Sequence, residues 1–262
     1  MSVYVADDPV AYEAFMGRWS RRLAPQLIAH AGIAAGDHVL DLGCGTGTLT
    51  EALADHGAVV TAVDYSHVYA DHTAARLAGR AVVEQGDARS LRFGDGAFDA
   101  AMASLVLDTI PEADRAVAEM RRVVRPGGTV AAGVFDYWGG YGVFALLWDI
   151  AAVLDEAGRA LRDELLSHPL PRAGALTGLW RAAGLIGVEE VPVVLSFDYA
   201  DFADYWSTFE TGQGRTGRYV VSLPAAARDR LRTHAEAAYR AGMPDGPRFF
   251  AVIVRAVRGT VP

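Results

Sequence analysis

The amino-acid sequence predicts an α/β fold, in which a doubly wound, mostly parallel seven-stranded sheet carries helices on both faces and a helical cap. Short apolar runs alternate with stretches of helical periodicity through the first half of the chain. The apolar runs are continuous, which is typical of parallel strands that are buried on both faces. A glycine-rich turn follows the first of these runs directly, at the point where doubly wound folds bind their ligands.

The individual elements can be predicted in order along the chain. Residues 1–36 form a helical arm, because apolar side chains recur there at steps of three and four residues. Strands are predicted at His38–Leu42, Val59–Asp64, Ala81–Gln85, Phe98–Ser104, Gly128–Phe135, Val188–Phe197 and Arg248–Arg255. Helices are predicted at Thr48–His56, Ser66–Leu77, Glu112–Val124 and Gly174–Leu185. Residues 37–262 then form one sheet domain, with helical cap insertions at about 137–172 and 201–243.

The composition excludes several classes of function. The 24 basic and 32 acidic side chains give a net charge of −8, so the chain lacks the excess of positive charge that attracts nucleic acid or an anionic membrane. The sequence contains no lysine, so a pyridoxal-phosphate Schiff base and a phosphate-loop lysine are both excluded. Cys44 is the only cysteine, so no multi-thiolate metal site is possible and no metal is expected.

The same survey predicts where the protein works. The longest apolar stretch, Val143 to Leu154, is interrupted by Asp149 and is too short to span a bilayer. The N-terminal residues carry acids where a signal peptide carries cations. We therefore expect a cytoplasmic protein, a monomer or homodimer, that acts on a small molecule without nucleic-acid or membrane partners.

The turn after the first predicted strand is the most informative segment. Val39 to Gly47 reads VLDLGCGTG, in which Gly43, Gly45 and Gly47 allow the backbone to turn sharply and approach a ligand closely. The next helix directs its N-terminal N–H groups at the same space. A nicotinamide dinucleotide site is disfavoured, because its fingerprint requires glycine or alanine where this chain has Thr48.

With the motifs that follow it, this turn resembles the cofactor loop of class I, Rossmann-like S-adenosylmethionine-dependent methyltransferases. The further matches are Asp64 at the end of the second strand, Gly86-Asp87-Ala88 after the third, Phe98-Asp99, and the MRRVVRPGG stretch of residues 120–128. The resemblance covers roughly residues 37–135, with every motif in the expected order. It implies S-adenosylmethionine as cofactor and S-adenosylhomocysteine as product.

The resemblance also implies roles for single residues. Asp64 accepts hydrogen bonds from the ribose hydroxyls, and Asp87 and Ala88 contact the adenine edge. The arm segment from Phe15 to Trp19 is similar to that of small-molecule members, many of them from secondary metabolism, in which an arginine such as Arg18 pairs with the cofactor carboxylate. The residues expected to bind the cofactor are Tyr12, Arg18, Asp41, Gly43, Gly45, Gly47, Asp64, Tyr65, Gly86, Asp87, Ala88 and Ser104.

The acceptor is expected beyond the carboxyl ends of the strands. Asp108 follows the fourth strand, where relatives often have histidine, and Asp136 follows the fifth. Each aspartate is a candidate base or substrate contact, and each can instead be structural; Asp108 in particular can cap a helix. The residues expected to line the acceptor pocket are Trp19, Leu105, Phe135, Trp138, Tyr141, Trp148, Trp206 and Tyr219.

The sequence thus predicts a methyltransferase for a small, largely apolar or aromatic, natural-product-like acceptor. One alternative keeps the fold and cofactor but catalyses a cyclisation or rearrangement, with the sulfonium in a structural or electrostatic role. A nicotinamide-dependent oxidoreductase is a second alternative, disfavoured by Thr48 and by the absence of a Tyr-x-x-x-Lys pair. A non-catalytic binding protein is the third.

Overall fold

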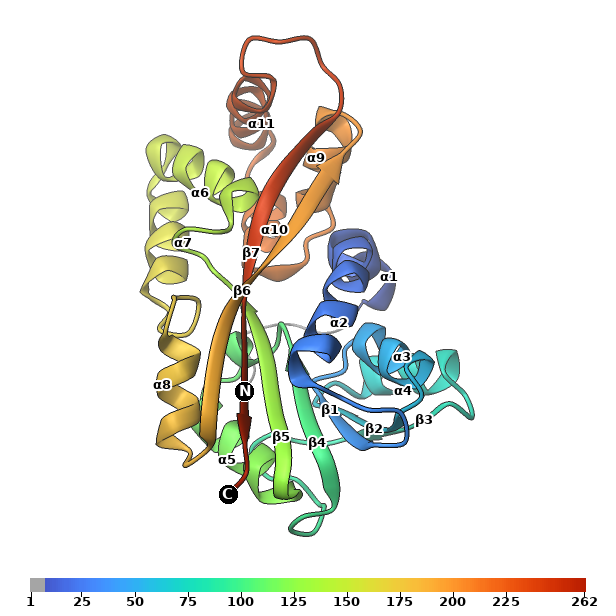
Figure 1. Ribbon diagram of the computed structural model, residues 1–262. Coiled ribbons are helices and arrows are strands. Elements are labelled where there is room, and N and C mark those ends of the chain that lie inside the picture. The colour runs from blue at the N-terminus through green and yellow to red at the C-terminus, as the bar shows by residue number, and fades with distance from the viewer. Residues whose placement is uncertain (1–7) are drawn as a thin grey trace.

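The computed structural model describes residues 8–262, and its centre is a seven-stranded sheet with the order β3-β2-β1-β4-β5-β7-β6 (Figure 1). All neighbouring strands are parallel except β7, which is antiparallel to both β5 and β6. The strands are β1 (His38–Leu42), β2 (Val59–Asp64), β3 (Ala81–Gln85), β4 (Phe98–Ser104), β5 (Val124–Phe135), β6 (Ile186–Tyr199) and β7 (Arg248–Thr260). The predicted fold class is confirmed.

Helices cover both faces of the sheet. The helices of the sheet domain are α2 (Arg18–Ala31), α3 (Thr48–Asp55), α4 (His67–Arg76), α5 (Ala113–Val123) and α8 (Ala175–Ala182). The apolar side of α2 and α3 belongs to one hydrophobic core, and that of α5 and α8 belongs to a second core on the opposite face. Helix α4 packs against β2 and β3 near the edge of the sheet.

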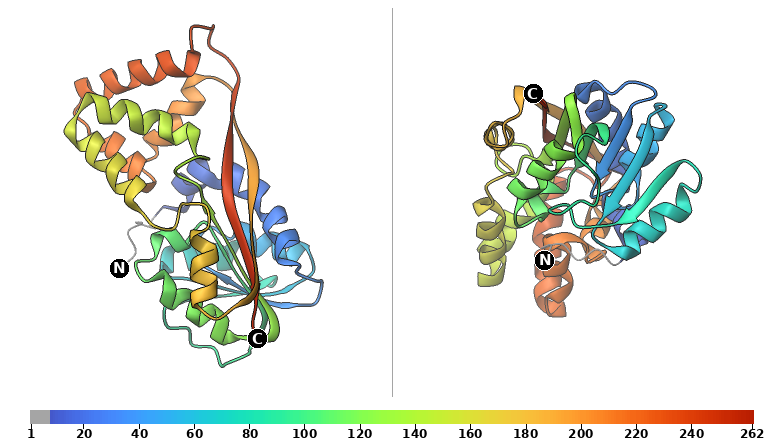
Figure 2. Two further views of the ribbon diagram at one scale, coloured as in Figure 1. Left: turned by 60° about the vertical axis from the view of Figure 1, so that its left-hand side comes forward. Right: turned by 90° about the horizontal axis from the view of Figure 1, so that it is seen from below.

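The cap consists of five helices beyond the carboxyl ends of the strands (Figure 2). They are α6 (Gly142–Leu154), α7 (Glu156–Ser167), α9 (Phe202–Glu210), α10 (Gly214–Ser222) and α11 (Ala225–Arg240). Strands β6 and β7 continue beyond the sheet into this cap, and they stay paired as far as Tyr199 opposite Arg248. The same two strands are therefore part of both the sheet and the cap.

The N-terminal arm is not one regular helix. Its described part begins with α1 (Pro9–Tyr12), which Asp8 caps by accepting from the backbone N–H groups of Val10 and Ala11. A π-helical turn at Glu13–Gly17 then leads into α2. Such turns are rare and are frequently found at functional sites. Residues 1–7 of the predicted arm lie outside the described residues.

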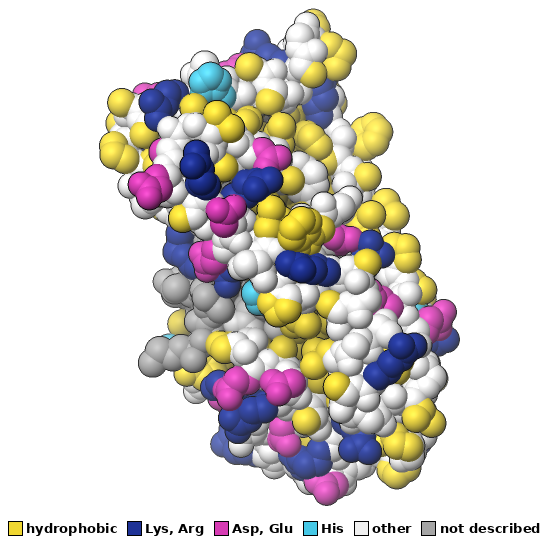
Figure 3. All heavy atoms as spheres, turned by 90° about the vertical axis from the view of Figure 1, so that its left-hand side faces the viewer, with side chains coloured by type: hydrophobic (Ala, Val, Ile, Leu, Met, Phe, Trp, Pro, Cys, Tyr) yellow, Lys and Arg dark blue, Asp and Glu magenta, His cyan; other side chains and the backbone are white. Residues whose placement is uncertain are grey.

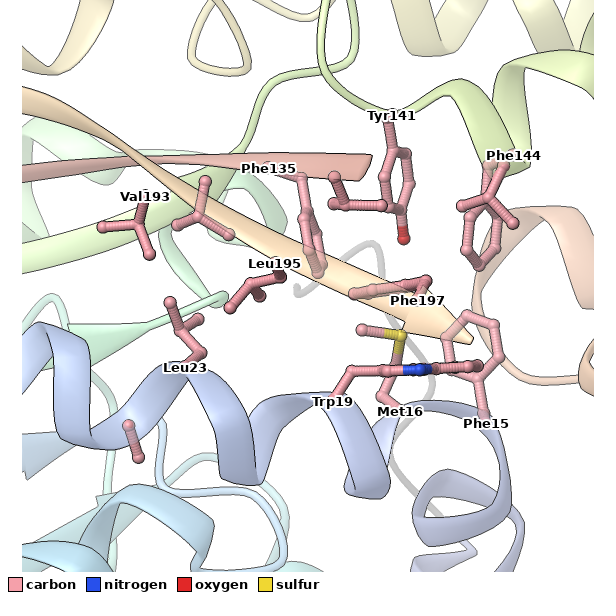
Figure 4. Close-up of a cluster of buried hydrophobic side chains, with 14 of the residues drawn as sticks. Phe15, Met16, Trp19, Leu23, Phe135, Tyr141, Phe144, Val193, Leu195 and Phe197 are labelled. Carbon is pink, nitrogen blue, oxygen red and sulfur yellow. The ribbon is translucent and has the colours of Figure 1, made fainter. Parts of the chain in front are cut away.

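The arm is fixed to the sheet and the cap by one aromatic cluster (Figure 4). The ring of Trp19 in α2 is fully buried and lies parallel to that of Phe197 in β6, with 4.3 Å between their centroids. The ring of Phe15 packs edge to face against that of Phe144 in the cap, with 5.8 Å between the ring centroids. The arm therefore contacts both parts of the molecule at the level where the strands end.

The surface mixes charges of both signs. On the face shown in Figure 3, acidic and basic side chains are interspersed, and apolar side chains gather between the sheet domain and the cap. Within the described residues, no helix is long and apolar enough to cross a membrane.

Candidate functional site

A cavity of about 900 Å³ opens at the carboxyl ends of β1, β2, β3 and β4. This volume lies within the range of about 300–1,000 Å³ that is typical of small-molecule sites. Nine of the residues predicted to bind the cofactor line it: Tyr12, Gly43, Gly45, Asp64, Tyr65, Gly86, Asp87, Ala88 and Ser104. The structure therefore brings together residues from five separate segments that the sequence assigns to one ligand.

The glycines of the loop after β1 form one wall of this cavity. Gly43, Gly45 and Gly47 have φ angles of 72°, 55° and 85°, a left-handed conformation that other residues rarely adopt. A Cβ atom on Gly43 would lie 2.5 Å from Cγ2 of Val106, which lines the same cavity. The loop therefore requires glycine for both its backbone conformation and its approach to Val106.

Asp64 holds the loop and still has hydrogen-bonding capacity to spare. Its Oδ2 accepts from the N–H of Gly45 at 2.8 Å, and its Oδ1 accepts from the N–H of Ser66 at 2.8 Å. A carboxylate has about four acceptor sites, so about two remain for hydroxyl groups of a ligand. Burial raises the pKa of Asp64, although the backbone N–H groups oppose that shift.

Asp41 lies behind the loop, outside the cavity lining. Its Oδ2 accepts from the hydroxyl of Thr50 at 2.6 Å, while its buried Oδ1 has no hydrogen-bond partner among the described residues. Burial raises the pKa of Asp41 to about 7, and the charge of Asp64 contributes in the same direction. Asp41 and Gly47 therefore support the loop from behind, and an unsatisfied carboxylate oxygen remains beside it.

This environment predicts a pH dependence of stability. Between pH about 4 and about 7 folded Asp41 retains a proton that the unfolded chain has released, so stability falls as pH rises through this window. Asp41→Asn keeps an acceptor for Thr50 but has no charge to lose. We expect the free energy of unfolding, measured with urea, to fall by about 2 to 3 kcal/mol more in the wild-type protein than in the variant between pH about 5 and about 7.5. Equal losses would contradict this prediction.

Asp87, at the other end of the cavity, is already held by a cation. Its carboxylate accepts from the backbone N–H of Arg89 and, at 3.0 and 2.7 Å, from Nε and Nη2 of the same residue. The hydrogen bonds from Arg89 lower the pKa of Asp87, and Arg89 also pairs with Glu112 at 2.6 Å. About one acceptor site of Asp87 therefore remains for an adenine amino group. Arg89, which sequence reasoning missed, lines the same cavity.

The arm covers the loop through residues other than the predicted arginine. The hydroxyl of Thr46 donates to Oε1 of Glu13 at 2.5 Å, and Tyr12 lines the cavity. Arg18 lies outside the cavity: its Nη1 is 3.1 Å from Oδ2 of Asp204 in α9, and its guanidinium lies 4.3 Å above the ring of Trp19. The structure thus places Arg18 outside the cavity lining and towards the cap, and its pairing with the cofactor carboxylate stays a prediction.

A second, smaller cavity of about 120 Å³ lies between the arm, the sheet and the cap. Tyr12, Leu105 and Thr109 line both cavities, so the two are adjacent. Leu105 has a φ of 57°, a strained conformation for this residue, and strain of this kind is common at ligand sites. The other apolar lining residues are Phe15, Met16, Phe135, Tyr137, Tyr141, Phe144, Trp148 and Leu165. The predictions for Leu105, Phe135, Tyr141 and Trp148 match this placement.

Four other predicted pocket residues lie elsewhere. Trp19 is buried against Phe197, and Trp138 is 57% exposed, with the guanidinium of Arg172 above its ring. The ring N–H of Trp206 donates to Glu210, and the hydroxyl of Tyr219 donates to Asp155. The Trp206 contacts lie within α9, whereas Tyr219 joins α10 to Asp155 at the start of α7. Aromatic content alone therefore does not separate pocket walls from cap core.

The carboxylate of Asp136, a candidate base or substrate contact in the sequence, is occupied by other partners in the structure. Its Oδ1 accepts from the backbone N–H groups of Trp138 and Gly139, both at 3.0 Å. Its Oδ2 accepts from Nε and Nη2 of Arg255 at 2.9 and 2.6 Å. The carboxylate is buried and lies outside both cavities, so it stabilises the turn after β5 instead.

Polar side chains from four segments meet at one end of the smaller cavity. Asp108 lies in a short 3₁₀ helix (Leu107–Thr109), and its Oδ2 accepts from the hydroxyl of Tyr137 at 2.8 Å. His168, at the end of α7, and Arg215, in α10, line the same cavity. Sequence reasoning found Asp108 alone. The other three come from the cap insertions and match no motif.

The comparisons with known proteins agree with this geometry. A family model described as a methyltransferase domain matches residues 40–132. Demethylmenaquinone methyltransferase of Clavibacter sepedonicus is 34% identical over 204 residues, which cover 74% of this chain and 80% of that protein.

Two solved structures share the fold at low sequence identity. Phosphoethanolamine N-methyltransferase 2 of Haemonchus contortus, in complex with S-adenosyl-L-methionine, superposes with a TM-score of 0.56 at 15% identity, over 92% of this chain and 52% of that one. The [4+2]-cyclase SpnF superposes with a TM-score of 0.53 at 22% identity, over 92% of this chain and 81% of that one.

Proposed function

Because this chain belongs to the class I S-adenosylmethionine-dependent methyltransferases, we propose that it methylates a small, largely apolar or aromatic acceptor bound in the smaller cavity. The observation that carries the proposal is the adjacency of the two cavities, which share Tyr12, Leu105 and Thr109. The larger cavity has the glycine wall and free carboxylate capacity that suit S-adenosylmethionine. The smaller cavity is walled mainly by aromatic rings, which suit a flat acceptor.

In this proposal the chain contributes positioning and exclusion of water. S-adenosylmethionine, when bound, supplies a methyl group that its sulfonium makes electrophilic. Gly43, Gly45 and Asp64 hold the cofactor at the strand ends, and Leu105 and Thr109 lie where the two ligands meet. The rings of Phe15, Phe135 and Tyr141 orient the acceptor and keep water out.

Methyl transfer is tested with methyl-labelled S-adenosylmethionine and a panel of small aromatic acceptors. We expect label in the acceptor and an equal amount of S-adenosylhomocysteine. Thr109→Trp, which fills the junction of the two cavities, should abolish product. Val153→Trp is the matched control, because Val153 is exposed on the cap and lies outside the lining of both cavities, and this variant should retain activity.

A cyclisation or rearrangement is the second candidate function, and the fold shared with a [4+2]-cyclase supports its inclusion. The same experiment distinguishes the two functions. A product that carries no label, formed without S-adenosylhomocysteine, would contradict methyl transfer and support the alternative.

A further inference from the structure

The polar end of the smaller cavity points to the chemistry of the acceptor. Resting on the proposed function, we propose that the acceptor is a single-ring phenol or enol and that the Asp108 carboxylate receives the proton of its hydroxyl. A cavity of about 120 Å³ has the size of one aromatic ring, since an apolar cavity of about 150 Å³ holds benzene. The aromatic wall holds the ring, and the polar end receives the hydroxyl group.

Asp108 has one oxygen committed and one available. Tyr137 donates its hydroxyl to Oδ2 at 2.8 Å, and within residues 8–262 no side chain donates to Oδ1. Burial raises the pKa of Asp108, which makes this carboxylate a stronger base than an exposed one. Burial also raises the pKa of Tyr137 well above its usual value, so Tyr137 remains a donor and acts as a positioning residue for Asp108.

The other groups at this end favour a developing negative charge on the acceptor oxygen. His168 accepts the N–H of Leu170 on Nδ1 at 3.4 Å, so its neutral ring donates through Nε2. Burial lowers the pKa of His168, although the charge of Asp108 opposes that shift. Arg215 lines the cavity and pairs with Glu164, a half-exposed residue, at 3.3 Å. A cationic amine acceptor is disfavoured, because the positive charge of Arg215 acts on Asp108, which is the only carboxylate among the described residues that line this cavity.

The step balances without a further reactant. The O–H bond of the acceptor breaks and its proton moves to the Asp108 carboxylate. An O–CH₃ bond forms while the bond from that methyl group to sulfur breaks, and its electron pair stays on sulfur. The products are a methyl ether, a neutral thioether and a protonated Asp108, which afterwards releases its proton to water.

The proposal is tested by the pH dependence of phenol binding to the protein saturated with S-adenosylhomocysteine, in which no turnover occurs. The probe is 4-nitrophenol, with nitrobenzene as the analogue that lacks the hydroxyl, and calorimetry gives both affinities. Above the pKa of the probe, wild-type protein must take up a proton to bind it beside Asp108. We therefore expect its affinity for 4-nitrophenol to fall about tenfold per pH unit.

Asp108→Asn should bind the phenolate without proton uptake, with less than about a threefold change in affinity over the same pH range. Asp149→Asn is the matched carboxylate-to-amide control, because Asp149 is exposed, pairs with Arg162 and lies outside the lining of both cavities, and this variant should keep the wild-type dependence. Nitrobenzene should bind all three proteins independently of pH, which also reports that they are folded. The same pH dependence in Asp108→Asn and wild type, or a wild-type protein that binds no 4-nitrophenol, would overturn the proposal.

The two proposals fail separately. Label transfer to an acceptor that has no ionisable hydroxyl would overturn the role of Asp108 and leave methyl transfer intact. Proton-linked phenol binding without label transfer would support the site and contradict methylation.

Discussion

Gly43→Ala should weaken S-adenosylmethionine binding by about 100-fold or more. A left-handed conformation costs a residue with a Cβ atom about 1 to 2 kcal/mol, and the overlap with Val106 at 2.5 Å adds about 1 to 3 kcal/mol. Relief of that overlap moves either the loop or Val106 into the cofactor cavity. Calorimetric titration with the cofactor measures the loss directly.

Gly79→Ala is the matched control for this prediction. Gly79 has a similar φ of 77°, but a Cβ atom there would meet nothing within 4 Å. This variant should lose about 1 kcal/mol of stability from backbone strain alone and bind the cofactor normally. A Gly43→Ala protein with affinity within about threefold of wild type would show that the loop has no need of this glycine.

Asp136→Ala should cost about 3 to 5 kcal/mol of folding stability, with little effect on the turnover of the molecules that stay folded. Removal of this carboxylate leaves the Arg255 guanidinium unpaired and two backbone N–H groups without an acceptor. Urea unfolding measures the first effect. The effect on turnover is measured as activity per folded molecule, in buffer without denaturant and at a temperature well below the thermal unfolding transition.

Two further variants separate the parts of this effect. Asp136→Asn keeps the acceptor for Trp138 and Gly139 and should lose less stability than Asp136→Ala. The double variant Asp136→Ala/Arg255→Met should recover part of the loss, because no unpaired charge remains. A large fall in turnover with unchanged stability would instead support the acceptor-facing role that the sequence suggested for Asp136.

The strands of the sheet were predictable because each is a local pattern with clear ends. The predicted bounds of β1, β2 and β4 equal those observed, since each apolar run stops at a turn residue or a polar one. Strand β5 begins at Val124 rather than Gly128, because Val124 pairs with Phe98 before a shift in register that brings Thr129 opposite Ala100. Strands β6 and β7 extend to Tyr199 and Thr260, beyond the predicted ends, because their partners rather than their own residues set their length.

The cofactor loop and the polar end of the smaller cavity also differed in how far the sequence could predict them. The cofactor loop is encoded within a few residues, so Gly43 and Gly45 could be assigned from the resemblance of this short segment to the family's cofactor loop. The polar end of the smaller cavity joins Asp108 to Tyr137, 29 positions later, and to His168 and Arg215 beyond it. Only the tertiary packing of the cap brings these side chains together. Arg18 pairs with Asp204, 186 positions later, and no local pattern in the sequence predicts that contact.

The uninterrupted pairing of β6 with β7 limits how the molecule can open. The backbone ladder runs from Glu189 opposite Arg258 in the sheet to Tyr199 opposite Arg248 in the cap, so no hinge separates the two. We expect backbone amides along this ribbon to exchange with deuterium as slowly as those of the central strands. Because the paired ribbon leaves no hinge between the sheet and the cap, we expect ligands to enter the smaller cavity through transient release of the arm, which is joined to α9 by the Arg18–Asp204 contact. Deuterium exchange of the backbone amides in α1 and the π-helical turn reports how often the arm opens, and we expect ligands to enter no faster than this opening rate.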